Sequence, residues 1–227
     1  MTAAPHCNRI AAAPVALVLL AGLIGGMGTA VAAGLPGGFT LEGLGNALAV
    51  ALETSVVEEV LFRGVVLWGL ISWWGSGRTK QAVVVSALLF GILHLAPDGP
   101  LVSDQAWSAA QTSGIPWLIL AIQAVLKVTQ ATLFGVLMAQ LVVRSLWFQA
   151  VGWLRARSLA APLGLHFAFD VLYLGIPLCI GLSLPDSYLT GSMADVVTVA
   201  VTTLLLAAAL RFSCRQGMHC GQAGGSC

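Results

Sequence analysis

Two adjacent glutamates and an arginine lie in the middle of a long apolar run, where charged side chains are costly. Glu58, Glu59 and Arg63 fall within the run from about Leu44 to Trp74. A charged side chain at the centre of a bilayer costs roughly 2.5–3.5 kcal/mol. In a helix, Glu59 and Arg63 share a face, whereas Glu58 points about 100° away. The spacing predicts one carboxylate neutralised by Arg63 and one free for chemistry; a purely structural ion cluster is the alternative.

Two histidines fall in other apolar segments and add further chemical groups. Phe90 stands one helical turn before His94, and Asp170 one turn after His166, so each pair shares a helix face. Gly91 permits a neighbouring helix to approach closely. A lone histidine in a membrane helix more often serves packing through a hydrogen bond. Three converging helices would instead gather imidazoles and carboxylates that activate water, through a metal or by general-base action.

The composition places these groups in a membrane protein. The chain has 227 residues, of which 58% are hydrophobic and 8% charged, and its mean hydropathy is +0.93. Soluble domains carry about 25% charged residues. The length fits an all-α, polytopic bundle of about six transmembrane helices. A net charge of +1 gives no basis for nucleic-acid binding, and the odd cysteine count argues against a disulfide framework.

Apolar segments separated by polar or Pro/Gly-rich breaks define the expected spans. The first resembles a signal peptide but is long enough to cross a bilayer, so we interpret it as an uncleaved helix. The second span is longer than one bilayer crossing, so either a tilted helix or a surface turn around residues 41–46 before it is expected. The fourth region is interpreted as one span despite its polar interruptions. The expected spans are 10–33, 44–74, 81–96, 115–143, 158–184 and 196–210.

The charges between these spans predict the orientation of the chain. With a cytoplasmic N-terminus, the outer segments carry only acidic residues, namely Glu42, Asp98, Asp104, Asp186 and Asp195. The inner segments then hold Arg9, Arg78, Lys80, Arg144, Arg155, Arg157, Arg211 and Arg215. This separation follows the positive-inside rule. It predicts that both termini are cytoplasmic.

Three short motifs together resemble the signature of a known family. Glu58-Glu59-x-x-x-Arg63, Phe90-x-x-x-His94 and His166-x-x-x-Asp170 are similar to the motifs of the CPBP intramembrane proteases. That family includes CAAX prenyl endopeptidases and bacterial bacteriocin-processing or immunity (Abi-like) proteins. The resemblance covers about residues 53–171. It implies an intramembrane endopeptidase that acts on a membrane-associated or lipid-modified substrate.

The resemblance also implies a division of the chain and a role for each motif residue. The first transmembrane helix or signal anchor would occupy 1–34, the catalytic core 35–184, the last transmembrane helix 185–213, and a flexible cytoplasmic tail 214–227. Glu58 and His94 match the residues that activate water, while His166 and Asp170 match the transition-state stabilisers. The full set of matched positions is Glu58, Glu59, Arg63, His94, His166 and Asp170.

Asp170 departs from the family pattern, which typically has asparagine at this position. An asparagine amide can donate to an oxyanion, but an ionised aspartate cannot. Asp170 must therefore be protonated, orient His166 as an acceptor, or bind a metal. The implied metal would be divalent, with zinc first, held by Glu58, His94, His166 and Asp170. A metal-free glutamate mechanism is the alternative.

Other functions fit the same buried polar residues. A non-catalytic immunity or scaffold protein would use the cluster for structure, and a small proton-coupled transporter would use it as a relay. No inverted half-repeat supports the transporter. Glu53 and Lys127 are interpreted as structural and able to pair with each other. The expected partners are a peptide or membrane-protein substrate and the lipid bilayer, in a multi-pass protein of a prokaryotic plasma membrane.

Overall fold

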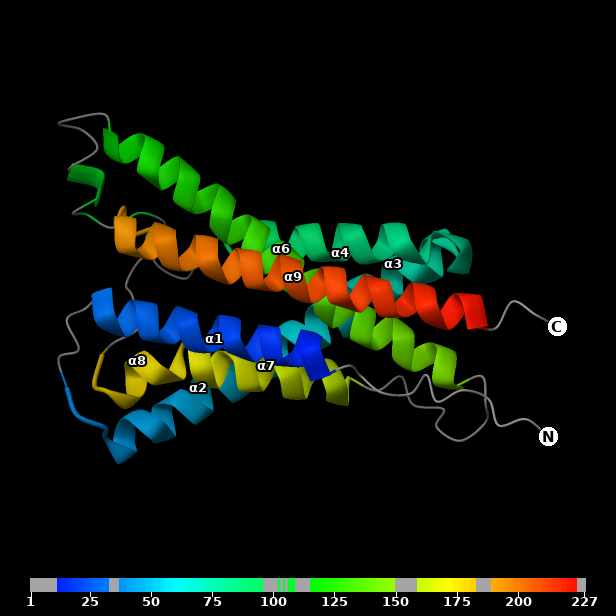
Figure 1. The fold of residues 1–227 in the computed structure, drawn as a ribbon, viewed down its shortest axis with the longest axis horizontal. Helices are drawn as coiled ribbons and strands as arrows, with labels where there is room; N and C mark the ends of the chain where they lie inside the picture. The colour runs from blue at the N-terminus through cyan, green and yellow to red at the C-terminus, as the bar shows by residue number, and fades with distance from the viewer. Residues whose placement is uncertain are drawn as a thin grey trace.

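The computed structural model describes residues 12–32, 37–95, 102, 104, 106–108, 115–149, 159–182 and 189–223. Regular structure within these ranges is helical, apart from an isolated bridge between Val102 and Leu189. The long helices run side by side in one bundle, with α1 beginning and α9 ending at the same end (Figure 1). The all-α class expected from the sequence is confirmed.

Most of the described elements are α-helices, and two short helical segments of other types lie among them. A π-helix, η1, and a short 3-10 turn, η2, interrupt or join the α-helices. In chain order the elements are α1 (Ala12–Ala32), α2 (Leu41–Glu59), η1 (Val60–Val66), α3 (Leu67–Trp74), η2 (Ser76–Arg78), α4 (Thr79–Leu93), α6 (Ile115–Gln149), α7 (Ala160–Tyr173), α8 (Gly175–Cys179) and α9 (Met193–Ala223).

Three helices in the described ranges are long and apolar enough to cross a membrane. These segments are Ala12–Val31, Trp117–Val143 and Met193–Cys214, in α1, α6 and α9. The other helices are shorter or carry several acidic residues. The polar groups singled out above lie mainly on these other helices. Of these, α4 and α7 have only 15 and 14 residues, and α2 carries four glutamates. The chain is an integral membrane protein.

The second apolar run is one continuous helical rod from α2 through η1 to α3. It begins at Leu41, because the Thr40 side chain accepts a hydrogen bond from the Gly43 amide at 3.0 Å and caps the helix. The surface turn expected at 41–46 is therefore wrong. The rod ends at Gly75, whose φ of +83° leaves the helical region.

Other helix boundaries also differ from expectation. The region from Ile115 forms one helix, α6, as interpreted, but it continues to Gln149. The last helix, α9, continues to Ala223, whereas the sequence predicted a tail from Cys214. The expected inner charges Arg9, Arg155 and Arg157, and the outer charges Asp98 and Asp186, lie outside the described residues.

Helix α1 is packed into the bundle through its glycines. It lies against α7 and α9 (Figure 1). A Cβ atom added at Gly26 would lie 2.1 Å from the Leu172 carbonyl oxygen, and one at Gly25 would lie 2.2 Å from the Tyr173 ring. Helix α7 carries two motif residues, His166 and Asp170. Because Gly25 and Gly26 have no side chains, α1 packs closely on α7, the helix that carries these motif residues.

Replacing Gly26 by alanine should destabilise the bundle. The added methyl group meets backbone rather than a flexible side chain, and overpacking costs typically ~1–3 kcal/mol. Gly69→Ala is the matched control, since nothing lies within 4 Å of a Cβ atom built there. Thermal unfolding in detergent should show a lower midpoint for Gly26→Ala only. Equal midpoints for both variants would contradict the packing of α1 on α7.

Candidate active site

Helices α2, α4 and α7 bring four motif side chains together in the middle of the bundle. The His166 Nε2 atom lies 3.6 Å from Glu58 Oε2, and the His94 Nε2 atom lies 3.9 Å from the same oxygen. The His166 Nδ1 atom lies 2.7 Å from Glu59 Oε1. Both adjacent glutamates thus face one histidine, and the predicted convergence of three helices is present.

Glu59 is the fully buried member of the glutamate pair. Its side chain is 0% exposed, and its Oε1 atom lies 3.2 Å from Arg63 Nη1, which is also buried. The pairing of Glu59 with Arg63 predicted from their spacing is therefore confirmed. The same carboxylate accepts the hydrogen bond from His166 Nδ1, when that nitrogen carries the proton. Glu59 therefore fixes the ring orientation of His166 and leaves its Nε2 atom facing Glu58.

Arg63 is held by a third helix and by an aromatic ring. Its Nη2 atom donates to the Gly135 carbonyl of α6 at 3.3 Å. Its guanidinium carbon lies 4.5 Å from the centre of the Phe90 ring, a cation–π distance. A buried arginine needs such compensation because a single carboxylate leaves several of its donors unpaired. These contacts hold Arg63 beside Glu59.

Glu58 and Asp170 present oxygen atoms without a hydrogen bond. The Glu58 side chain is 23% exposed, in contrast to Glu59. Its Oε2 atom is buried and makes no hydrogen bond in the described structure, and Asp170 Oδ2 is in the same state. Asp170 Oδ2 lies 3.4 Å from His166 Nε2. Buried polar atoms are normally paired. Glu59 Oε2 and Arg63 Nη1 also lack a hydrogen bond, and Glu58 differs from that pair in its partial exposure.

Helix α4 positions His94 through its last turn. The His94 Nδ1 atom lies 2.7 Å from the Phe90 carbonyl oxygen, and the two rings lie 4.3 Å apart. This contact leaves Nε2 for Glu58. A Cβ atom at Gly91 would lie 2.1 Å from Thr132 Oγ1. The predicted close helix approach at Gly91 is confirmed, and it is made by α6.

The motif residues include side chains of the kinds that bind the implied metal. Two imidazole nitrogens and two carboxylates are ligands that zinc accepts. In the described part of the chain, however, no group of three or more His, Cys, Asp or Glu side chains is placed to hold a metal ion. The residues as arranged do not fit a metal centre. We therefore assign no step of the proposed peptide hydrolysis to a metal.

Two further charged residues lie away from this cluster. Glu53 is exposed on α2. Lys127 pairs with Asp195 of α9 at 3.3 Å, so the suggested pair of Lys127 with Glu53 is wrong. Sequence reasoning did not identify the polar network around this pair, in which Gln123 donates to Asp195 and to Thr190. That network ties α6 to the start of α9.

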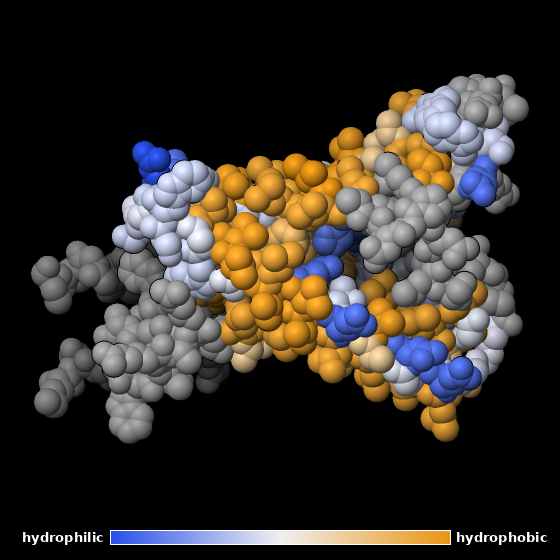
Figure 2. Space-filling view, turned by 180° about the vertical axis from the view of Figure 1, so that it is seen from behind, coloured by the Kyte–Doolittle hydropathy of each residue, from blue (hydrophilic) through white to orange (hydrophobic). Residues whose placement is uncertain are grey.

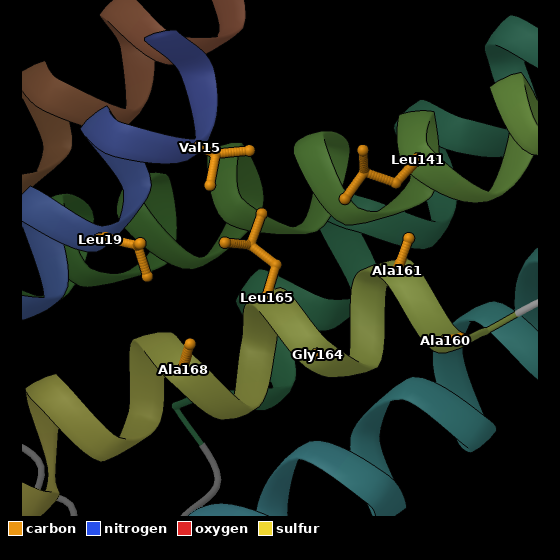
Figure 3. Close-up of a pocket in the computed structure, with 8 residues that line it drawn as sticks. All are labelled: Val15, Leu19, Leu141, Ala160, Ala161, Gly164, Leu165 and Ala168. Atoms are coloured by element: carbon orange, nitrogen blue, oxygen red, sulfur yellow. The ribbon is translucent and has the colours of Figure 1, made fainter. Parts of the chain in front are cut away.

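The apolar cavity between α1, α6 and α7 is separate from the polar cluster. It measures about 380 Å³ and is lined by Val15, Leu19, Leu141, Ala160, Ala161, Gly164, Leu165 and Ala168 (Figure 3). The α7 residues that line it lie on the side of that helix opposite His166. Figure 2 shows hydrophilic residues set into a mainly hydrophobic face of the molecule. The cavity therefore does not hold the reacting groups.

Removing one partner of the Glu59–Arg63 pair should be more harmful than removing both. Glu59→Gln or Arg63→Met leaves an uncompensated buried charge, which costs about 3–5 kcal/mol. The double variant should recover part of that loss. Unfolding free energies from a double-mutant cycle would measure the coupling, with exposed Arg78→Met as the control. Additive losses would show that the two side chains do not compensate each other.

Comparison with known protein families gives a match over the part of the chain that carries the motif residues. Residues 40–172 match the family described as type II CAAX prenyl endopeptidase Rce1-like. The match covers more than half of the chain and contains the clustered motif residues. Neither the curated proteins nor the solved structures gave a match. The chain therefore belongs to the Rce1-like family of type II CAAX prenyl endopeptidases.

Proposed function

We propose that this protein is an intramembrane endopeptidase in which Glu58 and His94 activate water. The observation that carries the proposal is the position of Glu58 Oε2, which is buried, makes no hydrogen bond, and faces two imidazole nitrogens at 3.6 and 3.9 Å. These separations exceed a direct hydrogen bond. One water molecule can bridge polar groups at such distances. The family of the chain, a peptidase family, supports the same reaction class.

In the first step, the Glu58 carboxylate removes a proton from this water, while the neutral His94 Nε2 accepts the second hydrogen bond of the water. The hydroxide oxygen attacks the scissile carbonyl carbon, and the carbonyl π electrons move to its oxygen. Such a base acts best within hydrogen-bond reach of the water. The partial exposure of Glu58 gives the substrate access that the fully buried Glu59 lacks.

The developing oxyanion is stabilised by His166 and Asp170. If Glu58 and Glu59 are ionised, a charged Arg63 and a protonated His166 balance them. Asp170 is then neutral, since a further buried negative charge would be uncompensated. A protonated His166 donates through Nε2 and a neutral Asp170 through its hydroxyl, two donors aimed at one oxygen. This assigns Asp170 the first of the three roles considered for it.

The second step breaks the peptide bond. The tetrahedral intermediate collapses, its carbon–nitrogen bond breaks, and the Glu58 carboxyl group returns its proton to the leaving amine. Glu58 is thereby restored as a carboxylate. Glu59 and Arg63 do not touch the reacting atoms in this scheme; they hold His166 through the 2.7 Å contact at Nδ1.

The proposed substrate is the peptide segment of a membrane-associated or lipid-modified protein. The family description names a CAAX prenyl endopeptidase, which supports a substrate anchored near the bilayer. We also propose six crossings with both termini in the cytoplasm of a prokaryotic cell. The support is the separation of charges: Arg78 and Lys80 stand at one end of the α2–α3 rod, and Glu42 at the other.

Glu58→Gln should abolish peptide cleavage while the protein remains folded. The amide keeps the size of the side chain but cannot accept a proton, and loss of a general base typically costs ~10²–10⁴-fold in rate. Glu53→Gln, on the exposed face of the same helix, is the matched control. Cleavage of a quenched-fluorescence peptide library would be measured for both. Normal cleavage by Glu58→Gln would overturn the assignment, and a variant that fails to fold would favour a scaffold role.

A divalent metal, with zinc first, remains a prediction of the family resemblance. Its test is elemental analysis of the purified protein beside activity with and without a chelator. A stoichiometric metal whose removal stops cleavage and whose return restores it would support Glu58, His94, His166 and Asp170 as ligands. Chelator-resistant cleavage that still requires Glu58 is the result expected from the arrangement described above. It would assign Glu58 as a metal-free general base.

A further inference from the structure

The helix that carries the glutamates changes its hydrogen bonding directly after Glu59. From Val60 to Val66 it is a π-helix, and at its end the Leu67 amide donates to the Phe62 carbonyl, five residues earlier. In an α-helix this bond spans four residues. Short π-helical segments within α-helices are rare and occur frequently at functional sites. Arg63 lies within this segment and Glu59 immediately before it.

Arg63 lies on the same face of the rod as Glu59, in a row that continues to Leu67. Buried residues of the rod recur at every fourth position, at Gly43, Ala47, Ala51, Ser55 and Glu59, and then at Arg63 and Leu67. In an α-helix, a four-residue spacing rotates by about 40° at each step, because a turn holds 3.6 residues. A turn closed by five-residue bonds holds more residues and reverses that drift. A four-residue spacing places Arg63 beside Glu59 in either type of helix, so η1 adjusts the rotation of the guanidinium about the rod.

Ser86 of the neighbouring helix α4 forms a hydrogen bond with this π-helical segment. Its hydroxyl donates to the Phe62 carbonyl at 3.2 Å, and the residue is 2% exposed. Several other hydroxyls in this protein bond to their own helix: Thr54, Thr129 and Thr198 each donate to the carbonyl four residues earlier. Ser86 instead bonds across to the π-helix. The Phe62 carbonyl thus accepts from both Leu67 and Ser86.

Ser86, Phe90 and His94 lie at successive turns of α4, and each contacts the α2–η1 segment that carries the glutamates and Arg63. One turn later, Phe90 packs edge-on against the Phe62 ring at 4.9 Å and under the Arg63 guanidinium. One turn further, His94 faces Glu58. A shift at Ser86 therefore changes the register of the helix pair that carries the reacting groups.

We propose that Ser86 is a positioning residue for the peptidase reaction, which holds the π-helix so that Arg63 and Glu59 keep His166 in place. The proposal rests on the proposed function, because the role of Ser86 is exerted on those reacting groups. Ser86 does not touch the substrate in this scheme. Its hydroxyl acts through the Phe62 carbonyl alone.

The test compares Ser86→Ala with Ser55→Ala. Ser55 is a matched control. It is fully buried on α2, and its hydroxyl donates to the Leu52 carbonyl of the same helix at 3.2 Å. Ser86→Ala should lower kcat by ~10- to ~100-fold, the loss expected from a small misplacement of reacting groups, with KM within about twofold. Ser55→Ala should keep both parameters, and Ser86→Thr, which restores a hydroxyl, should recover most of kcat.

A second measurement does not depend on catalysis. Amide hydrogen exchange should accelerate over residues 60–67 in Ser86→Ala but not in Ser55→Ala, because the π-helix loses an external hydrogen bond. Unchanged exchange and unchanged kcat in Ser86→Ala would overturn the proposal, as would equal kcat losses in both alanine variants. If exchange is faster in Ser86→Ala but the wild-type protein has no peptidase activity, the proposed function is overturned, and with it the positioning role of Ser86 in that reaction. The hydrogen bond from Ser86 to the π-helix would still be supported.

Discussion

The buried ion pair between Glu59 and Arg63 is the interaction on which the rest of the site depends. Both side chains are almost completely buried, at 0% and 1% exposure, in a bundle made mainly of apolar residues. Attraction between two buried charges repays their desolvation only where further hydrogen bonds satisfy the remaining groups. Here the Gly135 carbonyl, the Phe90 ring and the His166 imidazole supply part of those contacts, while Glu59 Oε2 and Arg63 Nη1 make no hydrogen bond in the described structure. The helices that carry the reacting groups, and α6 beside them, are thereby joined around one charge pair.

This joining requires helices that approach closely. The α6 carbonyl that Arg63 reaches belongs to Gly135. The absence of a side chain there lets α4 approach α6, since a Cβ atom at Gly135 would lie 3.2 Å from Ala87. Gly91 meets Thr132 in the same interface. Without a hydrophobic force between helices in lipid, such close packing and interhelical hydrogen bonds supply much of the association. The same small residues that stabilise the bundle therefore also position the charges.

The sequence predicts contacts within one helix better than contacts between helices. Helical periodicity was sufficient for the Glu59–Arg63 pair and for the shared face of Phe90 and His94, since the members of each pair lie one turn apart. It predicts which face a residue occupies but not what faces it, so the bond from Arg63 to Gly135 and the pair of Lys127 with Asp195 were not predicted. The Thr40 cap was also missed, although threonine before a helix is a recognised start signal. The π-helix at 60–66 was not predicted either, since no local pattern of residue types marks it.

Two adjacent glutamates serve different purposes here because a helix separates neighbours by about 100°. That rotation places Glu59 in the interior, where Arg63 and His166 hold it, and leaves Glu58 partly exposed with a buried oxygen that makes no hydrogen bond. A single carboxylate cannot both anchor a histidine through a permanent contact and exchange protons with water, since the first role requires a constant charge. Adjacent residues on one rigid helix solve this conflict while fixing both groups relative to the same imidazole. The distance between the anchoring and reacting carboxylates is then determined by the backbone of one helix rather than by the packing of two.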